Sequence, residues 1–449
     1  MPDPIDNHRP SRRESLAWML AISGVWIAVY AGCNWITSHR TGVGVVQFAW
    51  ERRIPFIPWL IVPYMSIDLF FVAAPFACTS RRQLHVLAAR LVAATAIAGF
   101  FFLSVPLTLA EQRPTLDGWL GAIYEVLKAG DRPFNMFPSL HAALLLLIWP
   151  VYHRATAGPL RAVVYAWFVL IMGSLLPVYQ HHAIDVIGGV VLAALCIVAF
   201  PEASGPYRLY RGRRARIGAR YAAAAVPPVA LGIALGPWGA IPGWVGGALA
   251  LVACAYLFAG TSIFRKSGGR LHAGSRLLLA PYLLGLRATR RYWAHRTRHS
   301  WSRISDSLTI GRRPTRTEAR ALAADIAGVI DLTAEHDERD AFLGLPYLNI
   351  QVLDLTPPSV EHCRAATEFI SAHADRGTVF VHCGLGYSRS AAIAAAHLLA
   401  SGLARTADEA VRMVRRLHPP AQLNADDERA LCAYLNSIRP AGASSPPTL

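Results

Sequence analysis

Long apolar runs fill the first 264 residues, and they restrict what this chain can fold into more than any other feature. Several runs approach the roughly 20 residues that an α-helix needs to cross a bilayer. Inside a bilayer, backbone polar groups must be paired within helices or closed barrels. The runs therefore predict an all-α, polytopic bundle of membrane-spanning helices. We expect spans at about 16–37, 57–78, 91–109, 138–152, 162–177, 184–200, 221–235 and 244–264.

The loops between these runs alternate in charge. Arginines gather before the first span, between the second and third, between the fourth and fifth, and after the sixth and the eighth. Because positively charged loops stay in the cytoplasm, both chain termini are predicted to lie there. Arg40, Arg52 and Arg53 fall on the opposite side and are exceptions. The first run is long for a signal peptide and lacks an Ala-x-Ala exit, so it predicts a membrane anchor.

Positive charge is concentrated in residues 201–300. The chain carries a net charge of +16, and this segment holds fifteen Arg or Lys residues against one acid, Glu202. The charges flank apolar runs, and the sequence contains no nucleic-acid-binding motif. We therefore interpret the segment as juxtamembrane sequence that contacts anionic lipid headgroups, with no nucleic acid as partner. An apolar piece at 277–284 is too short to span and is expected at the membrane interface.

From about residue 301, short strand-like runs alternate with helical runs. Strands are expected at 308–310, 329–332, 348–352 and 378–381, and helices at about 315–327, 359–373, 389–401, 406–417 and 425–437. This alternation predicts a soluble α/β domain with a mostly parallel sheet and helices on both faces. The expected organisation is a disordered start (1–14), a six-helix membrane domain (15–205), a basic linker with a helical hairpin (206–300), the α/β domain (301–438) and a disordered tail (439–449).

One stretch of the α/β domain consists of a Cys, five residues and an Arg. The apolar run 378–381 leads into His382 and Cys383, and a glycine-containing loop then leads to Arg389 and Ser390 at the start of a helical run. Free N–H groups at a helix N-terminus favour a phosphate dianion. The same field favours the thiolate form of Cys383, which makes it a nucleophile. Arg389 can hold two phosphate oxygens at once.

This stretch resembles the phosphate loop of cysteine-dependent tyrosine and dual-specificity phosphatases. The resemblance implies a phosphocysteine on Cys383, with Ser390 easing its breakdown and His382 supporting the loop. Phosphate would be bound by the loop residues Gly384, Leu385, Gly386, Tyr387 and Ser388. The loop contains no Lys or Arg, which favours a phosphomonoester of low charge. No metal or other cofactor is expected for this chemistry.

A general acid is expected on a separate loop. Asp354 lies 29 residues before Cys383, follows a strand-like run and opens a loop. This position fits the mobile acid loop of the same family, in which an Asp protonates the leaving oxygen and later activates water. Asp331, at the end of another strand, is the alternative.

A second group of polar residues lies inside the membrane region, on the side predicted to be non-cytoplasmic. It comprises Lys128, Arg132, Ser139, His141, His181, His182 and Asp185. So many polar side chains at one membrane face indicate a site. His181 and Asp185 are four residues apart and share a helix face, so the carboxylate can orient the imidazole and raise its nucleophilicity. The pairing of Asp185 with His182 is the alternative.

In this site His141 could protonate a leaving oxygen, and Lys128, Arg132 and Ser139 could hold phosphate oxygens. The pattern resembles the PAP2 superfamily of type 2 phosphatidic acid phosphatases over roughly residues 55–200. The matching positions are Arg132-Pro133, Pro138-Ser139, His141, Ser174, His181 and Asp185, whereas Glu125, Leu140 and Leu175 depart from the pattern. Pro-Ser-Leu-His is similar to the inositol-phosphoceramide synthase branch, which transfers a headgroup. Hydrolysis and transfer therefore both stay open.

Together the two parts resemble bacterial membrane-bound fusions of a PAP2 domain with a dual-specificity phosphatase. The resemblance implies a multi-pass enzyme of the bacterial inner membrane, with a cytoplasmic cysteine site and a PAP2 site on the periplasmic face. The substrate would be a phosphorylated lipid or a phosphoprotein. One alternative is a membrane-anchored protein phosphatase whose PAP2 half only binds lipid. The other is an inactive lipid-sensing scaffold.

Overall fold

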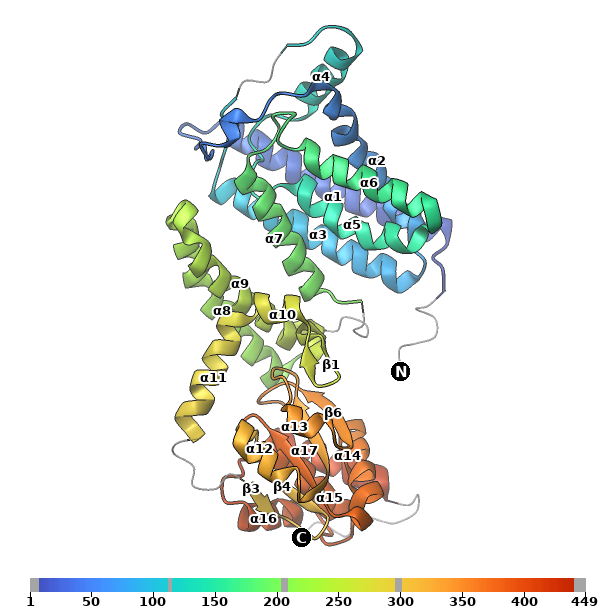
Figure 1. Cartoon of the computed structure of the whole chain (residues 1–449), viewed down its shortest axis with the longest axis vertical. Helices are drawn as coiled ribbons and strands as arrows, with labels where there is room; N and C mark the ends of the chain where they lie inside the picture. The colour runs from blue at the N-terminus through green and yellow to red at the C-terminus, as the bar shows by residue number, and fades with distance from the viewer. Residues whose placement is uncertain (1–7, 112–114, 203–208, 295–300, 440–449) are drawn as a thin grey trace. The chain divides into compact units, whose positions relative to one another are not determined.

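The computed structural model describes residues 8–111, 115–202, 209–294 and 301–439 (Figure 1). The chain divides into two compact units, Met1–Tyr207 with Ala230–Gly243 and Arg208–Val229 with Trp244–Leu449. Of the two stretches expected to be disordered, residues 1–7 and 440–449 lie outside the described residues. Helix α1 already begins at Arg12, because Ser11 caps it by accepting a hydrogen bond from the Glu14 N–H at 3.2 Å.

The first unit is a bundle of α-helices. Its helices are α1 (Arg12–Ser38), α2 (Ile61–Ala77), α3 (Arg81–Ser104), α4 (Gly118–Gly130), α5 (Leu140–Ala155), α6 (Gly158–Ser174) and α7 (Ala183–Ala199). One apolar core joins side chains of α1, α2, α3, α5, α6 and α7. Helix α4 was not expected from the sequence, because three glycines weaken its helix signal.

Five described helical segments are long and apolar enough to cross a membrane. They are Arg12–Ser38, Pro58–Ala77, Arg81–Ser104, Gly212–Ala234 and Ala240–Phe264. Helices α6 and α7 are apolar but shorter. The predicted membrane region built from α-helices is confirmed, and α8 (Gly212–Ala234) continues through Pro227 and Pro228.

The last of these segments is not one continuous α-helix. Helix α9 (Ala240–Cys254) is followed by a π turn, η5 (Ala255–Ala259), and a 3₁₀ turn, η6 (Gly260–Phe264). Gly260 has φ +68°, a conformation that glycine adopts without steric cost. Tyr256 and Phe264 are buried within the second unit. The residues after Cys254 are therefore packed against protein, and the continuous helix is shorter than the expected span 244–264.

The α/β part of the second unit contains a five-stranded sheet of order β3-β4-β7-β5-β6. The strands are β3 (Trp301–Arg303), β4 (Leu308–Arg312), β5 (Ile326–Thr333), β6 (Tyr347–Val352) and β7 (Thr378–Cys383). Strand β3 is antiparallel to β4, and the other neighbours are parallel. The predicted α/β domain with a mostly parallel sheet is thus confirmed, whereas β3 was not expected.

Helices cover both faces of this sheet. Residues alternate along β7, so that Val379 and Val381 pack on one face and Phe380 on the other. The first face is covered by α14 (Val360–His373), α15 (Arg389–Ala400), α16 (Ala407–Leu417) and α17 (Ala425–Ile438), and the second by α12 (Arg316–Leu322) and α13 (Asp340–Leu343). The helix expected at 315–327 ends at Leu322, because the chain enters β5 at Ile326.

The basic linker is part of the second unit. It forms a small hairpin, β1 (Lys266–Ser267) and β2 (Arg270–Leu271), then α10 (Ala273–Leu278) and α11 (Ala280–Ala294). Lys266 is buried, forms an ion pair with the buried Asp331 and donates to the Thr333 carbonyl at 2.8 Å. The sequence placed the start of the α/β domain at 301. The compact unit extends further upstream, because a cation of the linker neutralises an acid inside the sheet.

Removing the Lys266 charge is expected to destabilise the second unit. Lys266→Met leaves Asp331 as an uncompensated buried charge, which typically costs about 3–5 kcal/mol. Thermal unfolding of the full chain in detergent should show a clearly lower midpoint, and adding Asp331→Asn should recover part of it. The control is Arg303→Met, which removes an exposed ion pair with Asp306 and should cost about 1 kcal/mol or less. An unchanged midpoint for Lys266→Met would contradict this account.

Candidate active sites

Cys383 ends strand β7, and the loop after it folds back around its sulfur. The Gly386 N–H points to Cys383 Sγ at 3.2 Å, and Ser390 Oγ lies 3.5 Å from the same sulfur. Gly386 has φ +81°, and a Cβ there would lie 2.7 Å from the Arg312 backbone nitrogen. Only glycine fits this close turn, which directs the Gly386 N–H toward the sulfur.

Contacts from neighbouring segments fix the loop. Its Tyr387 carbonyl accepts from the Gln422 N–H at 2.7 Å, and His418 Nε2 lies 3.0 Å from the Gly386 carbonyl. Ser388 Oγ lies 3.4 Å from both carboxylate oxygens of Asp427 on α17. The loop is therefore formed in advance, as an anion site with low reorganisation cost requires.

Arg389 begins helix α15 and is buried at the carboxyl ends of the strands. Its guanidinium donates to both oxygens of Glu335, at 2.8 and 3.3 Å, and to the Val352 carbonyl at 2.8 Å. Burial alone would raise the pKa of Glu335, but the charges of Arg389 and then His336, together with hydrogen bonds, lower that pKa below its usual value. The carboxylate thus stays ionised and orients the guanidinium.

Asp354 lies on the loop after β6 and also contacts Arg389. Its Oδ1 is 3.1 Å from Arg389 Nη2. The Asp354 side chain is 42% exposed, whereas that of Glu335 is 4% exposed. Asp354 is therefore the partner that can move away when an anion binds Arg389. The predicted nucleophile, arginine and acid come together at this point.

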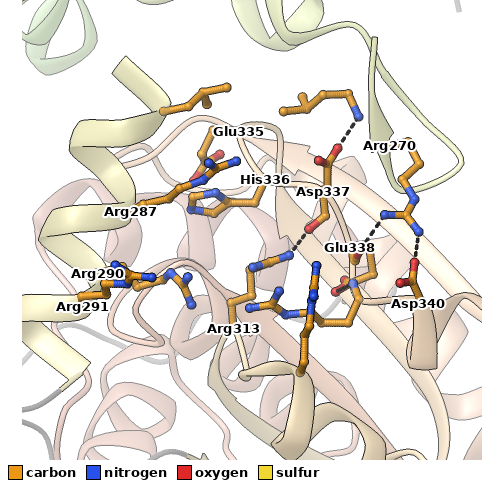
Figure 2. Close-up of a pocket in the computed structure, with 14 residues that line it drawn as sticks. Arg270, Arg287, Arg290, Arg291, Arg313, Glu335, His336, Asp337, Glu338 and Asp340 are labelled. Carbon is orange, nitrogen blue, oxygen red and sulfur yellow. Dashed lines mark hydrogen bonds and ion pairs between the residues drawn. The ribbon is translucent and has the colours of Figure 1, made fainter. Parts of the chain in front are cut away.

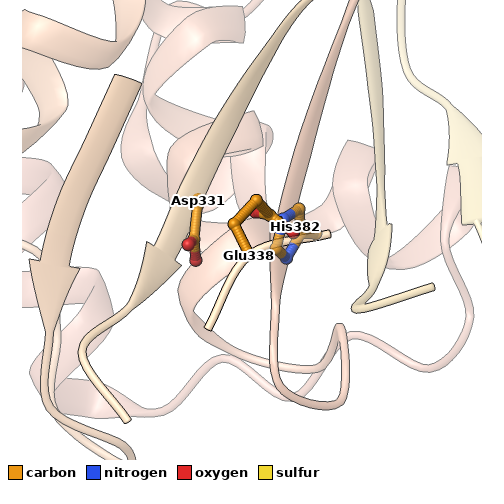
Figure 3. A group of neighbouring side chains, drawn as sticks. All are labelled: Asp331, Glu338 and His382. Atoms are coloured by element: carbon orange, nitrogen blue, oxygen red, sulfur yellow. The ribbon is translucent and has the colours of Figure 1, made fainter. Parts of the chain in front are cut away.

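Asp331, the alternative acid, belongs to a buried network beneath the loop. Asp331, Glu338 and His382 each place one atom with metal-ligand chemistry within 4.8 Å of the others (Figure 3). His382 Nε2 donates to Glu338 Oε2 at 2.7 Å, and Lys266 already provides a cation to Asp331. Burial would raise the pKa of Asp331, but Lys266 and then His382 lower it. These side chains form an ion-pair network that positions His382, the residue before Cys383.

The second cluster lies in the first unit, where helices α5 and α7 begin. His141 stacks on Tyr64 with ring centroids 4.3 Å apart, and its ring centroid lies 5.8 Å from that of His181. Nδ1 of His181 is 3.8 Å from Asp185 Oδ2 and has no hydrogen-bond partner among the described residues. Ser139 is buried beside them, and its N–H donates to the Asp185 carbonyl at 2.9 Å.

His182, the alternative partner of Asp185, is held elsewhere. Its Nδ1 lies 3.1 Å from Glu51 Oε2, and its Nε2 accepts from the Ala110 N–H at 3.1 Å. Asp185 accepts from the backbone N–H of His182 at 2.8 Å and so caps helix α7. Both ring nitrogens of His182 are therefore engaged, whereas the His181 ring faces His141.

The two predicted cations of this cluster have other partners. Lys128 Nζ donates to Glu125 at 2.8 Å, and Arg132 Nη1 donates to Ser38 at the end of α1 at 2.9 Å. The structure records no contact between either cation and His141 or His181 among the described residues. The structure thus brings Ser139, His141, His181 and Asp185 together. Lys128 and Arg132 contact other residues instead.

Sequence reasoning missed Glu51 and Glu335, which hold His182 and Arg389. Glu335 follows strand β5 in a run that contains three acids, Glu335, Asp337 and Glu338. Glu51 is a buried acid that begins the short 3₁₀ helix η2 (Glu51–Arg53), between α1 and α2. Two features of the sequence could have revealed them: Glu335 is an acid after a strand, and Glu51 is an acid inside a membrane region.

Comparison with known proteins identifies both parts of the chain. Residues 308–437 match the family described as "Dual specificity phosphatase, catalytic domain", and residues 87–206 match the "PAP2 superfamily". The chain is 30% identical over 142 residues to the "Phosphatidylglycerophosphatase and protein-tyrosine phosphatase 1" of Homo sapiens, covering 29% of this chain and 71% of that protein. The protein of the same name from Rattus norvegicus is 31% identical over 144 residues, with coverage of 29% and 74%.

Among solved structures, the chain is similar to Tk-PTP in its active form. That structure is 25% identical and covers 32% of this chain and 100% of its own, with a TM-score of 0.29. The match over more than two thirds of the human and rat phosphatases, together with the PAP2 match, settles the family. The chain therefore belongs to the dual-specificity phosphatase family, carries a PAP2 superfamily domain ahead of that catalytic domain, and is a membrane phosphatase that acts on phosphoesters.

Proposed function

We propose that the cysteine site hydrolyses the phosphomonoester of a membrane phospholipid. The Tyr256 hydroxyl donates to the main-chain carbonyl of Asp354 at 2.9 Å, and this observation carries the proposal. Tyr256 lies in η5, the turn that follows α9, within the apolar segment Ala240–Phe264, which is long enough to cross a membrane. The loop that bears the acid is thus held where the chain leaves the bilayer, and a lipid headgroup can reach it without leaving the membrane. The name of the human relative, a phosphatidylglycerophosphatase, supports a phospholipid substrate.

In this mechanism the Cys383 thiolate attacks phosphorus. An S–P bond forms, the P–O ester bond breaks, and Asp354 gives its proton to the leaving oxygen. The substrate phosphate takes the place of Asp354 on Arg389, while Glu335 keeps the guanidinium oriented. Loop N–H groups of residues 384–388 stabilise the other oxygens in the transition state.

Water then attacks the phosphocysteine. Asp354 accepts the water proton, Ser390 donates a hydrogen bond to the departing sulfur, and inorganic phosphate leaves as the thiolate is restored. His382 supports the loop through Glu338. The side chains supply every proton transfer, so the proposed cycle uses no cofactor.

For the PAP2 site, we propose that His181 is the nucleophile. Its Nδ1 faces Asp185, which orients the ring, so the other ring nitrogen attacks phosphorus. An N–P bond forms, the P–O ester bond breaks, and His141 gives a proton to the leaving oxygen. Ser139, Lys128 and Arg132 would bind phosphate oxygens, for which the two cations must exchange their present partners. Either water or an alcohol can then accept the phosphoryl group, so the site is a phosphatase or a phosphotransferase.

The two sites are proposed to lie on opposite membrane faces. Positively charged segments beside membrane helices favour the cytoplasmic side, and such segments precede α1 and follow Phe200. On this basis Cys383 would lie in the cytoplasm and His181 on the outer face. In a bacterium this corresponds to the inner membrane, with catalytic parts near 15–205 and 301–438. The reducing cytoplasm also keeps Cys383 a thiol.

Substitutions in the cysteine site should distinguish the role of Cys383 as nucleophile from that of Asp354 as acid. In a His181→Ala protein in detergent, Cys383→Ser should remove essentially all release of phosphate from a short-chain phosphatidic acid. Asp354→Ala should slow that alkyl ester about 100-fold or more, and should slow an aryl phosphate far less because its leaving group needs no proton. Equal slowing would point to another acid. Efficient turnover of a phosphotyrosine peptide but not of lipid would favour a protein phosphatase.

Variants of the PAP2 site should separate the two neighbouring histidines. In a Cys383→Ser background, His181→Ala and Asp185→Ala should abolish phosphate release or headgroup transfer, whereas His182→Ala should be milder. A phosphoenzyme trapped on His181 should be labile in acid and stable in base. If His182→Ala is the inactive variant, the assignment along α7 is wrong. If none of the three matters, the PAP2 half acts only as a lipid-binding anchor.

Reporter fusions should reveal the membrane orientation. A reporter that is active only in the periplasm is expected to be active when fused after residue 120 and inactive after residues 210 and 300. The measurement is reporter activity normalised to fusion-protein level. An active fusion at 300 would place both sites on the outer face and contradict the proposed topology.

A further inference from the structure

A strongly basic cavity of about 460 Å³ lies beside the cysteine site, within the second unit. Seven of its fourteen lining residues are arginines and four are acids. Figure 2 shows Arg287 and Arg290 extending from helix α11 toward His336 and Arg313. The cavity is thus lined by the linker helix on one side and by loops of the catalytic domain on the other.

The acids of this cavity already have partners. Glu335 is bound by Arg389, Glu338 accepts from His382, Asp337 pairs with Arg276, and Asp340 pairs with Arg270. In contrast, among the residues that the structure describes, no carboxylate forms an ion pair with Arg287, Arg290, Arg291, Arg313, Arg316 or Arg339. The cavity therefore holds more arginines than carboxylates, and its carboxylates form their close contacts with other partners.

These arginines also crowd one another. Burial, followed by the charges of Arg313, Arg312, Arg291 and Arg287, lowers the pKa of Arg290 to about 10. Arg313 is only 7% exposed, and its Nε has no hydrogen-bond partner among the described residues. Bringing like charges close together costs free energy, and an anion bound in the cavity would reduce this repulsion.

The cavity borders the phosphate loop. A Cβ on Gly384 would lie 3.9 Å from Glu335 Oε1 and from His336 Nε2, and both residues line the cavity. The Arg313 N–H donates to the Cys383 carbonyl at 2.8 Å. A ligand bound on the loop can therefore extend directly toward the arginines.

We propose that this cavity binds a second phosphate group of the substrate while its phosphomonoester occupies the Cys383 loop. The inference rests on the proposed function of the cysteine site and names its substrate class, a headgroup with two phosphates such as a phosphodiester followed by a terminal phosphomonoester. The Cys383 loop itself contributes no cationic side chain. The cations come from α11, outside the matched catalytic domain of residues 308–437, and from the loops that face it.

The test uses two short-chain lipids with identical acyl chains, assayed in neutral detergent with the full-length His181→Ala protein. One is phosphatidic acid, and the other carries a phosphodiester followed by a terminal phosphomonoester. The wild-type cysteine site should prefer the second lipid. Arg287→Gln with Arg290→Gln should lower the ratio of kcat/KM for the two lipids about tenfold or more, mainly through KM. The control pair, Arg364→Gln with Arg416→Gln, removes the same charge from exposed positions of α14 and α16 and should leave the ratio unchanged.

Several outcomes would overturn the proposal. An unchanged ratio in the α11 variant would do so, as would an equal loss on both lipids. A loss of activity that appears only in vesicles of anionic lipid would show that the arginines bind neighbouring headgroups instead.

If the wild type cleaves an aryl phosphate but neither lipid, the proposed function fails. The cavity is then tested by inhibition of aryl phosphate hydrolysis. In the wild type, 1,3-propanediol bisphosphate should inhibit better than propyl phosphate. This difference should disappear when Arg287 and Arg290 are both replaced by Gln. The exposed Arg287→Gln alone guards against misfolding of the double variant.

Discussion

The cysteine site depends on one buried charge, the guanidinium of Arg389. It joins the carbonyl at the end of β6, the carboxylate of Glu335 after β5 and the partly exposed Asp354 to the first turn of α15. A buried cation is tolerated only when it is paired and hydrogen-bonded, so these segments must converge for the domain to be stable. The same requirement sets the geometry for phosphate, because the guanidinium is already oriented and has one exchangeable partner.

The linker contributes to this catalytic unit as well as connecting it to the membrane. Lys266 neutralises Asp331 beneath the loop, Tyr256 holds the backbone of Asp354, and α11 provides one wall of the arginine-lined cavity. The segment that follows the membrane helices therefore supports the nucleophile and acid loops directly.

The residues of the PAP2 cluster are positioned by the N-terminal caps of two helices. Ser139 caps α5, and Asp185 caps α7 by accepting the His182 backbone N–H, which brings His141 and His181 close together. Satisfying the free N–H groups at helix starts thus also places the reactive side chains. Glu51 engages His182 from another loop, which leaves His181 as the imidazole with a free nitrogen.

The sequence by itself determined the fold class, because apolar length and alternation identify membrane helices and a parallel α/β sheet. It also predicted that Cys383, Arg389 and Asp354 lie together and that His141, His181 and Asp185 form a cluster, and the structure brings each group together. Only the tertiary structure decided the roles of Glu335, Glu51 and Lys266, since each meets its partner across a large sequence separation. It also showed that one linker cation, Lys266, pairs with an acid of the sheet, whereas the expected contact of the linker with lipid headgroups stays a prediction. A helix pattern indicates which side chains share a face, but the element packed against that face is fixed only by the fold.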